Sequence, residues 1–191
     1  DGKENIAGEK RVRQMLDVLN FANITDPSAY AAKDAYIFRI LTADYMRIPM
    51  TDVLKFIASV NSKRLAQKKQ GIFGETTLIS EFIKNGSHKA IKDLLEDASA
   101  KPVHAILMRY IEESGIFKFI LDKYDKDDLL RIRDLRGLTS FINMVKNSDL
   151  AQPGLTLAEF MDEIDTKLGH DIALEGELVT ATQEGVRIFT A

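Results

Sequence analysis

Apolar residues recur at helical spacing along almost the whole chain, and this pattern predicts an all-α protein. The clearest stripe fits positions i, i+3, i+4, i+7 and i+8 of one helix face and consists of Val103, Ile106, Leu107, Tyr110 and Ile111. Pro102 is typical of a helix start, and Gly115 is typical of a helix end. We therefore predict a helix between these two residues.

The same reasoning predicts helices over residues 9–22, 26–45, 51–60, 75–84, 88–98, 126–146 and 157–168. Thr156 and Glu159 form a capping-box pair ahead of the last of these helices. Residues 61–74 and 147–154 lack the helical pattern, and we expect a loop and a linker there. Together these segments indicate a multi-helix domain.

The end of the chain has a different pattern. Val186, Ile188 and Thr190 alternate with other side chains after the turn residues 183–185, which predicts a strand over 186–190. A single strand is not stable alone and needs a sheet to join. We therefore expect this short terminal strand to belong to a second domain that is truncated here.

Composition narrows the classes of function. The chain has 191 residues, of which 45% are hydrophobic and 29% are charged, so it is large enough for a real core. The absence of cysteine excludes disulfides, thiol nucleophiles and thiolate metal sites. No apolar stretch approaches the roughly 18 residues of a membrane span. We expect a cytoplasmic protein with no membrane contact.

Recognisable catalytic motifs are lacking. The phosphate-binding motif G-x-x-x-x-G-K-[ST] does not occur, and residues 71–74 are better explained as a turn. The acidic pairs at 127–128 and 162–163 are expected on solvated helix faces, and His104 is expected to flank a helix. The three histidines are far apart in sequence, which disfavours a metal site. We assign no catalytic residue and no metal ligand.

Charge is unevenly distributed. The formal net charge is −3, but Lys and Arg outnumber Asp and Glu over residues 1–95, and the reverse holds over 96–191. A nucleic-acid surface would therefore belong to the first half. The candidate DNA-binding residues are Arg47, Lys55, Lys63, Arg64, Lys68 and Lys69. The alternative is that this basic cluster is only a solvated loop and helix face, and both interpretations stay open.

Several segments, in this order, resemble one family. Residues 186–191 look like a strand that returns into a motif T-x-H-x-x-K-G-L-E, with Thr190 as its first position. Residues 103–116, followed by 131–138, are similar to a helix ending in S-G and a later run R-x-x-N-L-x-x-L, with Asp134 in place of asparagine. Two earlier segments, 12–21 and 36–41, also match. The chain resembles the 2B region of UvrD/Rep/PcrA-like DNA helicases, flanked by pieces of motor domain 2A.

The resemblance implies a division of the chain. Residues 1–25 would lead into an insertion, residues 26–180 would form a helical 2B-like domain, and residues 181–191 would return to the motor. It implies an accessory or regulatory domain of an ATP-dependent 3′–5′ DNA helicase in repair or recombination. ATP and Mg²⁺ would be bound by the parent protein, which would be the ATP hydrolase. This segment alone would bind neither.

The resemblance also implies partners: duplex DNA, bound weakly and without sequence preference, the remaining motor domains of the same chain, and a protein. The family contacts duplex DNA partly through a turn R-G-I-G, but the corresponding residues 46–51 contain no glycine. Two alternatives to this interpretation remain. The first is a free-standing all-α protein-interaction module, and the second is part of a helicase-nuclease subunit of the RecB or AddA type.

Overall fold

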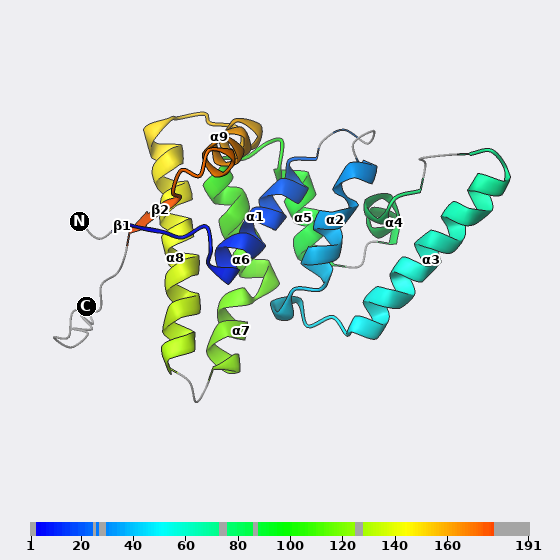
Figure 1. Cartoon of the computed structure of the whole chain (residues 1–191), viewed down its shortest axis with the longest axis horizontal. Helices are drawn as coiled ribbons and strands as arrows, with labels where there is room; N and C mark the ends of the chain where they lie inside the picture. The colour runs from blue at the N-terminus through cyan, green and yellow to red at the C-terminus, as the bar shows by residue number, and fades with distance from the viewer. Residues whose placement is uncertain are drawn as a thin grey trace.

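The computed structural model describes residues 3–24, 26, 30–72, 76–85, 88–124 and 128–177. These residues are mostly helical, in agreement with the all-α prediction (Figure 1). In chain order the elements are β1 (Lys3–Asn5), α1 (Lys10–Ala22), α2 (Tyr30–Leu41), the short 3₁₀ helix η2 (Asp44–Met46), α3 (Met50–Lys69), α4 (Leu78–Asn85), α5 (Lys89–Asp97), α6 (Val103–Ser114), α7 (Ile116–Lys123), α8 (Asp128–Ala151), α9 (Leu157–Gly169) and β2 (Glu175–Glu177).

Helices α1 and α6 form the centre of the molecule. Helix α1 packs against α2 and α8, and α6 packs against α5 and α8. Helix α4 packs on α2, while α3 makes its main contact with α4 and lies at the opposite end of the molecule from α8 and α9 (Figure 1). The predicted apolar stripe of α6 is buried along its whole length. Most of the described helices therefore share one core, and α3 stands at its margin.

The predictions with a complete local signal are confirmed. Helix α6 begins after Pro102 and ends at Gly115, whose φ of 67° is the left-handed conformation that favours glycine. Helix α9 begins with the predicted capping box, in which the Thr156 hydroxyl accepts from the amide of Glu159 and the Glu159 carboxylate accepts from the amide of Thr156. The ends of α6 and the start of α9 are thus determined by residues that lie close to each other in the sequence.

The loop predicted for residues 61–74 is wrong over its first part, because α3 continues to Lys69. The inner face of this second half is completed by charged residues that bond to other elements. Arg64 pairs with Asp34 of α2, and Lys63 pairs with Glu81 of α4. An apolar pattern cannot reveal a helix face whose partners are carboxylates.

Helix α8 also extends beyond its predicted end and includes most of the linker predicted for residues 147–154. Within this extension, a carboxylate oxygen of Asp149 accepts from the amide of His104, 2.8 Å away. That amide belongs to the first turn of α6, where no side chain of α6 itself caps the helix. The last turn of α8 thus supplies the missing cap of α6.

Two further predictions require correction. The helix predicted over residues 26–45 ends at Leu41, where Ala43 is extended and the chain turns into η2. Gly115 is not only the end of a helix, because α7 begins directly after it and buries Ile116 and Ile120. The break after Leu41 lets η2 reach α1, and the turn at Gly115 lets α7 pack on α8.

A two-stranded ribbon joins the two ends of the described region, and the sequence did not predict it. Strand β1 pairs antiparallel with β2, in a register that places Glu4 opposite Gly176. The ribbon lies on α8, and Gly176 has no room for a side chain, since a Cβ would lie 2.6 Å from Cγ2 of Ile6 and 3.0 Å from Cβ of Ser140. The strand predicted over residues 186–190 lies outside the described residues.

We predict that Gly176→Ala destabilises the protein by about 1–3 kcal/mol, because the added methyl must displace Ile6 or α8. Chemical denaturation followed by far-ultraviolet circular dichroism would measure the change. Gly169→Ala is the matched control, because nothing lies within 4 Å of its Cβ position, and it should alter stability by less than about 0.5 kcal/mol. Equal stability of the two variants would contradict the close packing of β2.

Candidate functional site

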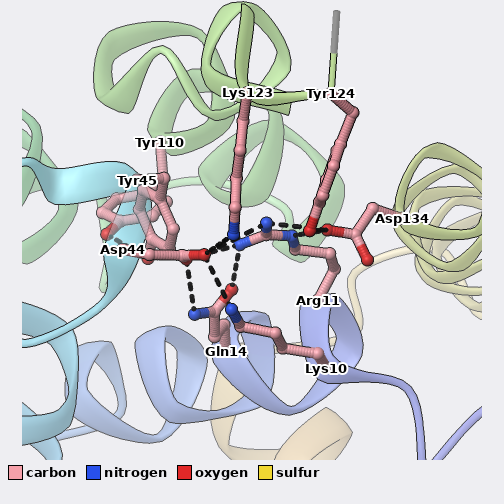
Figure 2. Close-up of polar contacts among 9 residues, drawn as sticks. All are labelled: Lys10, Arg11, Gln14, Asp44, Tyr45, Tyr110, Lys123, Tyr124 and Asp134. Carbon is pink, nitrogen blue, oxygen red and sulfur yellow. Dashed lines mark hydrogen bonds and ion pairs between the residues drawn. The ribbon is translucent and has the colours of Figure 1, made fainter. Parts of the chain in front are cut away.

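The most concentrated group of charges lies where α1, η2, α7 and α8 meet (Figure 2). At its centre is Arg11, whose side chain is only 1% exposed. Its guanidinium group donates a hydrogen bond to Asp44 at 2.7 Å on one side and one to Asp134 at 2.9 Å on the other, where a second nitrogen forms an ion pair with the same carboxylate at 2.7 Å. A buried arginine needs such partners, since an unpaired charge in a protein interior is strongly unfavourable.

Asp44 accepts from three cations in all. Besides Arg11, Lys10 lies 2.7 Å and Lys123 2.9 Å from Asp44 Oδ2. Partial burial acts to raise the pKa of this carboxyl group, but hydrogen bonds from Arg11, Lys10 and Lys123 outweigh it and hold the pKa well below its usual range. These cationic partners therefore hold the Asp44 side chain in its ionised form.

The opposite carboxylate, Asp134, is 2% exposed and also accepts from the hydroxyl of Tyr124 at 3.1 Å. Asp134 is thus the second carboxylate that balances the buried charge of Arg11, which a neutral amide would not do. These charges are mutually satisfied, and their arrangement is that of a structural centre rather than a catalytic one.

A more open group of cations lies beside this centre, on the ring of Phe119. The charged ends of Arg11, Arg47 and Lys123 all lie between 5.4 and 5.5 Å from the centre of that ring. Arg47 is 57% exposed and also pairs with exposed Asp122 at 3.3 Å. Sequence reasoning identified Arg47 but missed the other cations, because they come from α1 and α7, far away in the chain.

Arg47 occupies an unusual backbone conformation. Its φ of 54° lies in the left-handed region, which residues other than glycine, asparagine and aspartate seldom adopt. Arg47 lies three residues after Asp44, in the turn between η2 and α3. The Asp44 contacts therefore fix the base of the turn that presents Arg47.

The other predicted DNA-binding residues do not form one free basic surface. Lys63 and Arg64 point to carboxylates of α4 and α2, and Lys55 lies 3.7 Å from Asp52 on its own helix. Within the described residues, only Lys68 and Lys69 of this cluster have no ion-pair or hydrogen-bond partner for their side chains. The candidates are thus divided into four residues that pair with carboxylates and two lysines, Lys68 and Lys69, that have no partner among the described residues.

The remaining sequence candidates show no common site. Asp128 pairs with Arg131, and Glu163 lies 2.6 Å from Lys167, each within one helix. His104 lies in the first turn of α6, and the predicted motif position Thr190 is outside the described residues. In the part of the chain that the structure describes, no group of three or more His, Asp or Glu residues is arranged to hold a metal ion. None of the described helices is long and apolar enough to cross a membrane.

Comparison of the chain with protein-family models, with curated proteins and with solved structures finds no match. The relation to DNA helicases therefore rests on the sequence resemblance alone, and it stays a proposal.

We predict that Asp44→Asn destabilises the protein by about 2 kcal/mol at neutral pH, because three charged donors lose a carboxylate. The pKa of Asp44 is lowered in the folded state, so its contribution is complete above the unfolded pKa of about 4 and is lost as pH falls below that value. The stability difference between wild type and variant should therefore shrink between about pH 4 and pH 2.

The matched control is Asp122→Asn, which removes an exposed carboxylate from a single surface ion pair with Arg47. It should change stability by less than about 0.5 kcal/mol at any pH. Denaturant titrations of the three proteins at several pH values would give these differences. If Asp44→Asn and Asp122→Asn were equally stable at pH 7, the Asp44 centre would not have the structural role assigned to it.

Proposed function

We propose that residues 3–177 form an accessory domain inserted into the motor of an ATP-dependent DNA helicase related to the UvrD/Rep family. This unit begins before the boundary at residue 25 that the resemblance implied, because α1 packs against α2 and α8. The observation that carries this proposal is the ribbon of β1 and β2. Because the two strands are hydrogen-bonded neighbours, the chain enters and leaves the helical body at one place. A domain inserted into another domain needs this geometry, since its two connections must reach adjacent points of the host.

The conformation of Arg47 gives independent support. When Ile48 is matched to the isoleucine of the family's R-G-I-G turn, Arg47 occupies the place of the first glycine. Its positive φ is the conformation for which a glycine is usually selected. Pro49 takes the place of the second glycine and precedes α3 directly. The turn thus keeps a backbone shape that suits glycine although the glycines themselves are missing.

In the proposed parent protein, ATP and Mg²⁺ are bound by the motor, and this domain regulates unwinding in a cytoplasmic helicase. Cationic side chains near the turn between η2 and α3 would make the contact of this domain with duplex DNA. Arg47 is the most exposed of them, with Lys10 and Lys123 beside it at 50% and 37% exposure. Asp44 and Asp122 lie among these cations, so we expect weak binding that depends strongly on salt.

The second candidate is a free-standing all-α interaction module. Exposed apolar side chains on α3 favour it, since Leu54 and Leu65 are 55% and 62% exposed. The two candidates are not exclusive, because an inserted accessory domain can also bind a protein.

The coding sequence around this chain decides between an inserted domain and a free-standing module. We predict that translation continues after Ala191 as H-x-x-K-G-L-E and that a G-x-x-x-x-G-K-[ST] motif lies upstream of Asp1. Residues 1–191 purified alone should hydrolyse no ATP with or without single-stranded DNA. A stop codon directly after Ala191, or DNA-stimulated ATP turnover by the isolated chain, would refute the inserted-domain proposal.

For DNA contact, we predict that Arg47→Gly weakens binding to a duplex, while Arg47→Lys largely retains it. The glycine keeps the left-handed turn and removes the charge, so the effect of charge is separated from that of backbone strain. Fluorescence anisotropy over a salt series should show a slope that is smaller by about one unit for Arg47→Gly. Lys146→Ser, on exposed α8 surface, is the control. Identical slopes for wild type and Arg47→Gly would exclude this contact.

A further inference from the structure

Helix α3 exposes far more of itself than a helix that serves only the core. It has 20 residues, and a helix of that length extends for about 30 Å, yet only Val53 and Val60 are buried. Its inner face contacts α4, where the ring of Phe56 meets that of Phe82 edge to face with the ring centres 6.1 Å apart. The opposite side of the helix has no partner among the described elements (Figure 1).

The exposed side has a second apolar stripe. It follows spacings of four, four, three and four residues through Met50, Leu54, Ala58, Asn61 and Leu65, of which only Asn61 is polar. Such spacing places all five side chains along one line of a helix, well away from the line through Val53 and Val60. Met50, Leu54 and Leu65 are each more than half exposed. An ordinary solvated face does not carry leucines at this spacing, so this stripe, which we call the outer stripe, indicates a contact surface.

Cations border the outer stripe. Lys68 and Lys69 follow Leu65 by three and four residues, so both lie beside it at the end of the stripe, and Lys55 follows Leu54 directly and lies on the flank. Lys68 and Lys69 have no partner for their side chains within the described residues, and Asp52 is the acidic residue of α3. The outer side of α3 is therefore apolar along its centre and positively charged at its border.

From this arrangement we propose that the outer stripe of α3 is a docking site for an acidic amphipathic helix of a partner protein. Leu54 and Leu65 lie about three turns apart along one line of α3, and such a line is best buried against the apolar side chains of a second helix. Lysines on the flanks select glutamates or aspartates beside those apolar side chains. The charge of the occupant follows from the lysines, and its shape follows from the spacing of the leucines.

Two other possible occupants, duplex DNA and a second copy of this chain, do not fit both the lysines and the leucines. Duplex DNA would satisfy the lysines, but the leucines between them would face phosphates and sugars and gain little. A second copy of this chain offers acidic residues on α9, where Asp162 and Asp165 are exposed. The exposed apolar residues of that region, Leu168 and Ile172, lie only at its end, so they cannot line up with Leu54 and Leu65 together.

The test uses residues 1–191 and two synthetic peptides labelled with a fluorophore. The acidic peptide has leucine at heptad positions a and d and glutamate at e and g over roughly three heptads, and its twin has lysine in place of each glutamate. Glutamates at e and g also keep the acidic peptide from pairing with itself. We expect the acidic peptide to bind at micromolar concentrations and its basic twin to bind at least about tenfold more weakly.

The variants separate the apolar and the charged contributions. Leu54→Ser with Leu65→Ser should weaken binding of the acidic peptide by about tenfold or more. Lys68→Ser with Lys69→Ser should weaken binding less and reduce its dependence on salt. The control is Leu129→Ser with Leu150→Ser, two leucines of α8 that are 82% and 69% exposed, and it should bind as wild type does. Circular dichroism would verify that each variant is folded.

Three results would overturn the proposal. Equal affinity for the acidic and basic peptides would remove the charge argument, and unchanged binding by the Leu54 and Leu65 double variant would remove the outer stripe. A wild-type dimer in sedimentation that becomes monomeric in that double variant would make a second copy the occupant. This inference is independent of the helicase proposal, since loss of the Arg47 contact with DNA leaves the peptide result unaffected.

Discussion

The burial of one guanidinium group determines how the main elements of this protein meet. Arg11 lies inside the structure, and its charge requires a carboxylate on each side, one from η2 and one from α8. Asp44 can supply the first only if α2 ends early and the chain turns into η2. Asp134 can supply the second only if α8 lies directly against α1. The short helices and the crossing of α1 with α8 follow from this requirement.

The same centre determines what lies at the margin of the molecule. Because Asp44 is fixed by Arg11, Lys10 and Lys123, the turn at Arg47 and the start of α3 have a defined position on the body. The rest of α3 makes few contacts, which are the packing of Val53, Phe56 and Val60 and the ion pairs of Lys63 and Arg64, all on its inner side. A rigid base and a helix with an open outer side are what a domain needs to present a surface to another molecule.

Local signals in the sequence predicted the helices well, and distant partners explain what it missed. Thr156 and Glu159 are three residues apart, so their capping box can be seen in the sequence and is present in the structure. The second half of α3 was taken for a loop because its inner face bonds to Asp34 and Glu81, which belong to other helices. The ribbon of β1 and β2 joins segments at opposite ends of the described region. Three-residue strands carry too few side chains to show alternation.

The prediction of site residues was limited for the same reason, because the partners of these residues lie far away in the sequence. A sequence shows how many lysines and arginines a segment contains, but not which of them face a carboxylate. Four of the six predicted DNA-binding residues have an acidic partner in the structure, namely Arg47, Lys55, Lys63 and Arg64. On α3 the inner residues Lys63 and Arg64 are paired with carboxylates, so the outer side keeps the unpaired Lys68 and Lys69 together with the exposed leucines. A surface of this kind differs from a phosphate-binding one in its leucines, whose exposure the sequence alone could not show.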